Sequence, residues 1–213
     1  MKISLLAVAV FLFTACAVNH TPKPETISLF DGKTFNGWEG DTVNTWRIEN
    51  GALVGGSLTD SVKNNEFLAT VQTFKNFDLT LQFKLTGTSG FVNAGVQVRS
   101  QRMTNPAYEM TGYQADLGHF FWGALYDESR RNKFLARADA AMVNKLVRDG
   151  DWNDYRVRCT GRRIEIWLNG TQTVDYTEKD ESIVQSGLIA LQIHGGGKAE
   201  VAYKDIRLIR LPD

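Results

Sequence analysis

Hydrogen-bonding and titratable side chains recur at every second position in three segments of this 213-residue chain, with apolar residues between them. Because side chains at positions i and i+2 share one face of a β-strand, each segment would present these groups on a single face. Amide, carboxylate, guanidinium and imidazole groups offer donors and acceptors in fixed directions, which suits a polyhydroxylated ligand. We expect the three faces to line one concave cleft; the alternative is a solvated outer face. The residues are Asn93, Gln97 and Arg99, then Gln114 and Asp116, then Gln192 and His194.

Aromatic and charged residues follow the second of these segments. Two aromatic side chains there could stack on the apolar face of a sugar ring. The acidic and basic residues after them could form an ion-pair network at the mouth of the cleft. A further carboxylate, Glu66, stands at the start of a predicted strand. We therefore expect the rim of the cleft to contain Trp122, Tyr126, Asp127, Glu128, Arg130 and Arg131.

Several common chemistries lack their sequence signatures. The chain has no His-Glu-x-x-His zinc motif and no Gly-x-Ser-x-Gly nucleophile motif. It also lacks the Glu-x-Asp-x-x-Glu string of paired carboxylates that a retaining glucanase of sandwich fold would carry. Residues 195–197 are all glycine but have neither the lysine nor the helix start of a phosphate-binding loop. Lys and Arg total 24, as do Asp and Glu, so no basic excess indicates a nucleic-acid partner.

Alternation of apolar and polar residues dominates the chain from Ile27 onward, as it does in strands with one buried face. Asn169-Gly170 and Asn50-Gly51 stand between such segments and predict two-residue hairpin turns, because both residue types tolerate positive φ. Many short strands with frequent turns predict an all-β sandwich or jelly roll over residues 27–213. Residues 129–147 contain no Gly or Pro and interrupt the alternation, so they predict a short helical or loop insertion.

The first segment predicts export. Residues 1–16 combine one positive charge, a short apolar run and small residues before Cys16, which is the pattern of a bacterial lipoprotein signal peptide. We expect Cys16 to be lipidated and residues 17–26 to be a tether; the alternative is an ordinary signal peptide cut near Ala15. The mature protein would be an exported bacterial lipoprotein, periplasmic or on the cell surface, held to the membrane only by its lipid. Cys159 would remain as a buried, unpaired thiol.

A set of short motifs spreads over about residues 27–211. They are Ser28-Leu29-Phe30-Asp31-Gly32-Lys33, Gly37-Trp38, Trp46-Arg47-Ile48-Glu49-Asn50-Gly51, Asn76-Phe77-Asp78-Leu79, Asn93-Ala94-Gly95-Val96-Gln97-Val98-Arg99-Ser100, Gly112-Tyr113-Gln114-Ala115-Asp116, Trp122-Gly123-Ala124-Leu125-Tyr126-Asp127-Glu128, Trp152-Asn153-Asp154-Tyr155, Trp167-Leu168-Asn169-Gly170 and Leu191-Gln192-Ile193-His194. Together they resemble the 3-keto-disaccharide hydrolase domain family. The resemblance implies a concanavalin A-like jelly-roll sandwich, often on a bacterial lipoprotein, that cleaves glycosides oxidised to a ketone at C3.

The C3 ketone determines which chemistry the implied reaction needs. It acidifies the proton on C2, so a base can form an enolate and the C1 substituent can leave by β-elimination, with water adding later; direct hydrolysis stays open. Under the resemblance, His194 or Asp116 would be the base, and Arg99 or a bound divalent metal would hold the enolate. A metal, the one cofactor left open, would use Asp116, His194 and Glu66. The expected partners are a 3-keto sugar substrate and a separate sugar-oxidising dehydrogenase.

A non-catalytic carbohydrate-binding module is the alternative function. Such a module needs aromatic platforms and amides but no base, and Trp122, Tyr126, Gln97 and Gln114 would serve it equally well. The two functions differ in what they require of His194 and Asp116. Convergence of these two side chains on one cavity would favour the enzyme.

Overall fold

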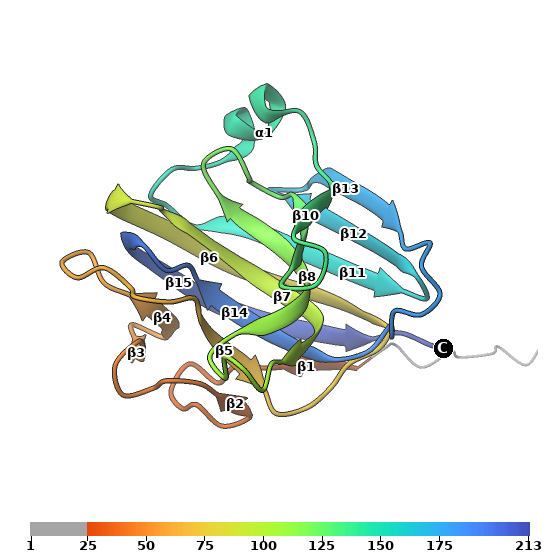
Figure 1. The fold of residues 1–213 in the computed structure, drawn as a ribbon, viewed down its shortest axis with the longest axis horizontal. Coiled ribbons are helices and arrows are strands. Elements are labelled where there is room, and N and C mark those ends of the chain that lie inside the picture. Colours follow the sequence, from red (N-terminus) through yellow and green to blue (C-terminus); the bar gives the residue numbers. More distant parts are fainter. Residues whose placement is uncertain (1–24) are drawn as a thin grey trace, which may run out of the picture.

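Residues 25–213 are described by the computed structural model and form two stacked antiparallel β-sheets (Figure 1). The eight-stranded sheet has the order β13 (Thr171–Thr177), β12 (Arg163–Leu168), β11 (Asn153–Thr160), β6 (Phe77–Gly90), β15 (Gly197–Arg210), β4 (Ala52–Gly56) and β3 (Trp46–Glu49), with β1 (Thr26–Ser28) also paired to β15. The seven-stranded sheet has the order β10 (Lys133–Ala136), β9 (Leu125–Glu128), β8 (Met110–Gly118), β7 (Asn93–Arg102), β14 (Leu188–Ile193), β5 (Glu66–Thr70) and β2 (Trp38–Glu39). The predicted all-β jelly-roll sandwich is confirmed.

The hydrophobic core lies between the two sheets and follows the alternation of the sequence. In β6, Leu79, Leu81 and Phe83 are buried, while Thr80 and Gln82 between them are more exposed. In β7, Val96 and Val98 face the same core. Strand β7 is buried on its other face as well, where Gln97 has no exposed surface. The outer face of the seven-stranded sheet is therefore covered and holds polar side chains away from bulk solvent.

Both predicted hairpin turns are present. Asn169 and Gly170 have φ of 48° and 81° and connect β12 to β13. Asn50 and Gly51 have φ of 50° and 75° and connect β3 to β4. Positive φ at both central positions is the backbone twist that antiparallel strands accept at a two-residue turn, so these dipeptides fix the register of their hairpins.

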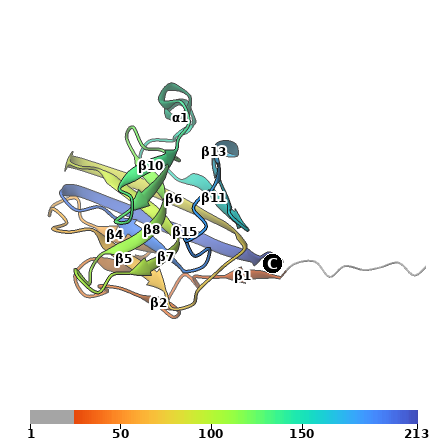
Figure 2. The same cartoon turned by 45° about the vertical axis from the view of Figure 1, so that its right-hand side comes forward.

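The insertion at residues 129–147 is part strand and part helix. Strand β10 pairs with β9 at the edge of the seven-stranded sheet, and the short helix α1 (Ala140–Leu146) follows it. The Asp139 side chain caps this helix by accepting a hydrogen bond from the Met142 backbone N–H at 2.9 Å. Only Val143 of the helix is buried. Helix α1 projects beyond one end of the sandwich, away from β1 and the C-terminus (Figure 2).

The predicted signal peptide and the lipidation site Cys16 lie outside the described residues, so their assignment stays a prediction. Thr26, which the sequence placed at the end of the tether, is the first residue of β1 and pairs with Ile209. Within residues 25–213, no helix is long and apolar enough to cross a membrane. Cys159 is fully buried and free, as predicted, and burial raises the pKa of its thiol to about 12.

Candidate functional site

A cavity of about 240 Å³ lies on the outer face of the seven-stranded sheet. Strand pairing places its polar groups side by side: Gln114 on β8 lies between Gln97 on β7 and Tyr126 on β9. Six of the residues predicted from the sequence line this cavity together with three phenylalanines. The lining residues are Phe91, Asn93, Gln114, Asp116, Phe121, Tyr126, Glu128, Phe134 and His194.

Asp116 is 5% exposed and is held through one of its two carboxylate oxygens. Oδ1 accepts hydrogen bonds from Asn93 Nδ2 at 3.0 Å and from the Leu117 backbone N–H at 3.1 Å, and Gln114 Nε2 lies 3.5 Å from the same oxygen. Oδ2 accepts no hydrogen bond from any residue in the range 25–213. One oxygen therefore fixes the side chain and the other is available to a ligand.

Asp116 shares the cavity with a second carboxyl group, Glu128, and the pKa of each is raised to about 7. Burial is the main cause in both cases, because it disfavours the charged form. The Glu128 charge raises the pKa of Asp116 further; charges on Glu109 and Asp127 raise that of Glu128, and the Gln192 amide opposes them. Since the two carboxyls interact, they titrate as a pair. Near neutral pH such a pair offers both a proton donor and a proton acceptor.

His194 follows β14 at the edge of the cavity, with its protonation pattern fixed by the backbone. Its Nδ1 lies 2.7 Å from the Gly195 carbonyl oxygen, which can only accept, so we assign the proton to Nδ1 and leave Nε2 as an acceptor. The glycines that follow permit close backbone packing: a Cβ on Gly197 would lie 2.3 Å from the Phe91 carbonyl oxygen. This packing fixes His194 and Phe91 side by side, with ring centroids 4.6 Å apart.

Four aromatic rings line one side of the cavity, and we call Phe91, Phe121, Phe134 and Tyr126 the aromatic wall. Successive ring centroids along it are 6.0, 5.5 and 5.0 Å apart. Sequence reasoning named only Tyr126 among these residues. The signal for Phe91 was present, since it precedes Asn93 by two positions and so shares its strand face. Phe121 and Phe134 lie outside the alternating segments and carried no comparable signal.

Two of the predicted glutamines lie beneath the cavity and do not line it. Gln97 is fully buried; its Nε2 donates to Gln114 Oε1 at 3.1 Å, and its Oε1 accepts from the Ser100 hydroxyl. Gln192 is also fully buried, but neither of its amide atoms has a hydrogen-bond partner among the described residues. Gln97 thus orients the side chain that contacts Asp116, and Gln192 is an unpaired amide near Glu128.

The prediction that Arg99 holds an enolate in the cleft is wrong. A β-bulge between Val98 and Gln101 breaks the alternation of β7, and Arg99 adopts a φ of 51°. Its guanidinium turns away from the cavity and donates to the carbonyl oxygens of Lys75 and Gly161, each at 2.7 Å, and to the side-chain oxygens of Gln185 at 2.7 Å and Asn76 at 3.1 Å. Arg99 therefore connects loops behind the sheet.

Four predicted rim residues also lie elsewhere: Trp122, Asp127, Arg130 and Arg131. Trp122 turns into the core, where its ring stacks on Phe83 with centroids 6.0 Å apart. Asp127 is fully buried and pairs with Arg130 and Arg131. Arg131 also pairs with the buried Glu178 at 2.6 Å. The predicted ion-pair network therefore exists, but it ties β9 to the end of β13 and does not line the cavity; only Glu128 of that acidic pair does.

The predicted metal ligands do not form a site. Asp116 and His194 line the same cavity, but Glu66 does not, and the charges near Glu66 are those of Asp41 and Arg102. Within residues 25–213, no group of three or more His, Cys, Asp or Glu side chains is placed to hold a metal ion. The donor set of the cavity therefore does not fit the divalent metal that the sequence left open.

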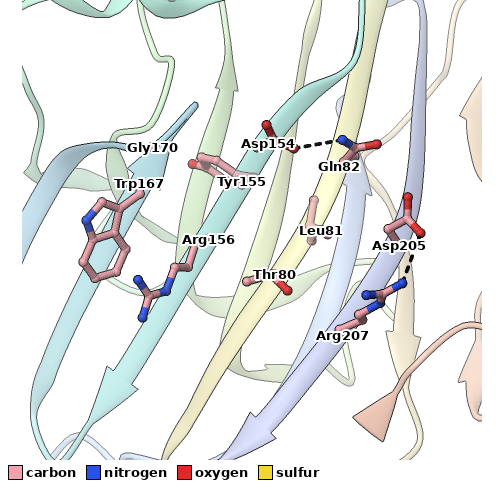
Figure 3. A pocket seen from close by; sticks show the side chains of 10 residues that line it. All are labelled: Thr80, Leu81, Gln82, Asp154, Tyr155, Arg156, Trp167, Gly170, Asp205 and Arg207. Carbon is pink, nitrogen blue, oxygen red and sulfur yellow. Dashed lines mark hydrogen bonds and ion pairs between the residues drawn. The ribbon is translucent and has the colours of Figure 1, made fainter. Parts of the chain in front are cut away.

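A larger groove of about 590 Å³ crosses the outer face of the eight-stranded sheet (Figure 3). Its polar groups are paired with one another: Gln82 Nε2 donates to Asp154 at 2.8 Å, and Asp205 lies 3.8 Å from Arg207. The Arg156 guanidinium covers the Trp167 ring at 4.5 Å and also pairs with Asp78. The groove is open and both of its carboxyl groups, Asp154 and Asp205, are more than half exposed, whereas Asp116 is buried, so we place the candidate site in the smaller cavity.

The fold and cavity together define a β-sandwich protein with a buried, titratable and aromatic-lined pocket on one sheet. The model of the 3-keto-alpha-glucoside-1,2-lyase-like domain family matches residues 25–209, nearly all of the described chain. The chain belongs to this family. A 3-keto-disaccharide hydrolase of Bacteroides thetaiotaomicron is 37% identical over 86 aligned residues, which amount to 35% of this chain and 29% of that protein. The chain thus spans less than a third of that relative.

Solved structures with the same fold include enzymes and binding modules. A Parabacteroides distasonis protein, provisionally assigned as a glycosyl hydrolase, aligns with a TM-score of 0.64 and 22% identity over 88% of this chain and 94% of its own. A carbohydrate-binding module of Bacillus subtilis aligns with a TM-score of 0.61 and 12% identity, over 80% and 94% of the two chains. A β-glucanase of Bacillus licheniformis aligns with a TM-score of 0.55 and 9% identity, over 91% of this chain and 100% of its own. These likenesses establish the sandwich fold.

Proposed function

We propose that this protein cleaves glycosides that carry a ketone at C3, by base-catalysed elimination followed by hydration. The observation that carries the proposal is the meeting of Asp116, Glu128 and His194 in one cavity, with both carboxyl pKa values near 7. A sugar-binding pocket has no need of such groups, whereas proton transfer near neutral pH does. Membership of the 3-keto-glycoside family supplies the substrate class.

The first step is removal of the C2 proton by the free Oδ2 of the Asp116 carboxylate. The electrons of the C–H bond form the enolate, whose charge rests on the C3 oxygen. The Tyr126 hydroxyl donates a hydrogen bond to this oxygen. Burial and the charges of Glu128 and Asp116 raise the pKa of Tyr126, which keeps its proton in place.

The second step breaks the bond between C1 and the leaving oxygen. The enolate collapses to an enone with a C1–C2 double bond, and protonated Glu128 gives its proton to the departing oxygen. Water then adds its hydroxyl to C1, and a proton returns to C2 from Asp116. His194 Nε2, the acceptor left free by the Gly195 contact, receives the proton that the water loses, and transfer of that proton to Glu128 in the same cavity restores both groups. The net reaction consumes one water and yields a 3-keto sugar and an alcohol.

A non-catalytic carbohydrate-binding role is the second candidate, favoured by the aromatic wall and by the fold it shares with the Bacillus subtilis module. Amides and aromatic rings would bind an unoxidised sugar as well as an oxidised one. The enzyme would act only on sugars oxidised at C3, whereas the binding module would bind oxidised and unoxidised sugars alike.

We also propose that the protein acts outside the cytoplasm, anchored through a lipid on Cys16. The support is the sequence pattern of residues 1–16. A separate dehydrogenase must then supply the ketone, because the cleavage chemistry oxidises nothing. Membrane partitioning that is lost in a Cys16→Ala variant tests the anchor; a wild-type chain that is fully released from membranes in a bacterial host would contradict it.

The decisive experiment incubates the protein with C3-oxidised glucosides and their unoxidised parents in deuterated water. We expect cleavage of the oxidised compounds alone, with deuterium at C2 of the product, because the Asp116 carboxyl exchanges its proton with the solvent before it protonates C2. Asp116→Asn and His194→Ala should each lower kcat/KM by about 10²–10⁴-fold, while Asp154→Asn, in the groove of Figure 3, should leave it unchanged. Near wild-type rates in both variants would contradict the assigned roles. Sugar binding without any cleavage would establish the binding-module alternative.

A further inference from the structure

The cavity is chemically divided into a polar half and an aromatic half. The polar half carries five hydrogen-bonding side chains: Asn93, Gln114, Asp116, Glu128 and His194. The aromatic wall contributes four rings with one polar atom, the Tyr126 hydroxyl, and it adjoins the polar groups where Phe91 contacts His194 and where Tyr126 pairs with Gln114. The carbonyl and hydroxyl groups of a keto sugar match the polar half. The wall therefore needs a ligand group that has little hydrogen-bonding capacity.

The size of the cavity places that group outside the sugar ring. Its volume of about 240 Å³ is below the ~300–1,000 Å³ of pockets that enclose drug-sized ligands, so it holds one sugar ring. The aromatic wall is longer than one such ring, because its successive centroids are 6.0, 5.5 and 5.0 Å apart. Part of the wall then faces the substituent at C1, which is the part of a glycoside that can offer more apolar area than the single apolar face of a sugar ring.

The wall continues to the surface at Phe91, which is 42% exposed. Large exposed apolar side chains next to a cavity mark a surface that a ligand covers. The rings already present tilted and stacked contacts to one another, at 63° between Phe91 and Phe121 and 12° between Phe121 and Phe134. A further aromatic ring can join such an arrangement edge-to-face or offset-stacked. A second sugar would find only the Tyr126 hydroxyl there.

We propose that the aromatic wall binds an aromatic leaving group, so that the preferred substrates are aryl glycosides oxidised at C3. This rests on the proposed function. Phe91 and Phe121 are the specificity-determining residues, because they form the end of the wall nearest His194. The substrate divides between the two halves of the cavity, with the keto sugar on the polar side and the aryl group along the wall.

The test compares kcat/KM for 4-nitrophenyl and methyl 3-keto-glucosides, each as both anomers, in the wild type and in variants. Because an aryl group is the better leaving group in any case, the measured quantity is the aryl-to-methyl ratio in each variant relative to the wild type. Phe91→Ala and Phe121→Ala should each lower that ratio about 3–10-fold, which corresponds to loss of one aromatic contact. Phe121→Leu guards against a folding defect, and it should lower the ratio in the same direction.

Phe120 supplies a matched control in the same loop. It is 64% exposed and does not line the cavity, so Phe120→Ala should leave the ratio unchanged. An unchanged ratio in the Phe91 and Phe121 variants would overturn the proposal. So would a loss of kcat/KM on a 3-keto-disaccharide as large as the loss on the 4-nitrophenyl substrate. If the wild type cleaves no substrate, the proposed function fails. Calorimetric binding then tests separately whether the aromatic wall binds an aryl group. Tighter binding of the 4-nitrophenyl than of the methyl 3-keto-glucoside would support it, and equal affinities would refute it.

Discussion

Replacing Asp116 with Asn should make the protein more stable at alkaline pH while lowering the proposed activity. The pKa of Asp116 is about 7 in the fold, against an ordinary value of 3.8. Between these values the folded state holds a proton that the unfolded chain has lost, so the free energy of unfolding decreases as pH rises through the window. A shift of about three pKa units corresponds to roughly 4 kcal/mol at most, and coupling to Glu128 reduces the share that one substitution recovers.

An Asn side chain has the same shape and stays neutral at every pH in the window. Its Oδ1 can still accept from Asn93 Nδ2 and from the Leu117 N–H, so the local hydrogen bonds remain. We expect the variant to gain about 2–3 kcal/mol over the wild type at pH 8. For a chain of this length that gain raises Tm by about 4–12 °C. At pH 4 both proteins are neutral at this position, and the gain should vanish.

The assay is thermal unfolding, followed by circular dichroism from pH 4 to pH 8, with the variant-minus-wild-type difference in Tm plotted against pH. Taking this difference cancels the titration of all other groups. Asp205→Asn is the control, because its carboxyl is more than half exposed and lies 3.8 Å from Arg207, so the same substitution there removes no buried carboxyl group. An Asp116→Asn difference that is flat, or negative at pH 8, would refute the claim that burial raises this pKa.

Three other predictions use different parts of the structure. Glu178→Gln should destabilise the protein by about 3 kcal/mol at pH 7, because it leaves Arg131 without one of its carboxylates. Burial alone would raise the pKa of Glu178, but hydrogen bonds from Arg131, the Asp180 N–H and Tyr113 lower it to about 2. The destabilisation measured by urea titration should therefore fade as pH falls from about 4.5 toward 2, and a constant destabilisation would contradict the assignment. Gln192→Met should move the alkaline limb of the activity profile to higher pH, because the Gln192 amide lowers the pKa of Glu128, whose proton the second step of the proposed reaction needs. It should also raise Tm, since neither amide atom has a hydrogen-bond partner among the described residues and an unpaired buried amide costs about 1–3 kcal/mol; a fall in Tm would show that Gln192 is satisfied in solution. Cys159 should react with a thiol reagent only at the rate of unfolding, and rapid labelling of the native protein at pH 8 would show that it is not buried.

The fold was predictable because its signals are local and repeated. Alternation in β6 and β7 marks the buried faces, and two Asn-Gly turns fix the registers of their hairpins. The insertion was harder, because residues 133–136 have no alternation of their own and become a strand only by pairing with β9. An edge strand of this kind depends on tertiary contacts, which a single sequence does not display.

The candidate site was predictable as far as the alternation holds. Asn93, Gln114 and Asp116 lie on regular strand segments, and the structure brings them into one cavity. Alternation in the sequence places Arg99 on the same strand face as Gln97, but the bulge after Val98 turns its side chain away from the cavity. The sequence does not predict this bulge, because Arg99 adopts positive φ although it is neither Gly nor Asn, the residue types that usually mark such a position.

The loop after β8 shows the same limit in a form that bears on function. Trp122 was the better sugar-stacking candidate by composition, yet it fills the core against Phe83, and its neighbour Phe121 lines the cavity instead. The loop closes through hydrogen bonds from the Phe121 N–H to the Gly118 carbonyl oxygen and from the Gly123 N–H to the Asp116 carbonyl oxygen, both at 2.9 Å. The same backbone that carries Asp116 thus sets which aromatic residue lines the cavity. Asp116 and Phe121 are consequently held by one hydrogen-bonded loop, and we expect a change that moves this loop to alter the proposed proton transfer and the proposed leaving-group preference together.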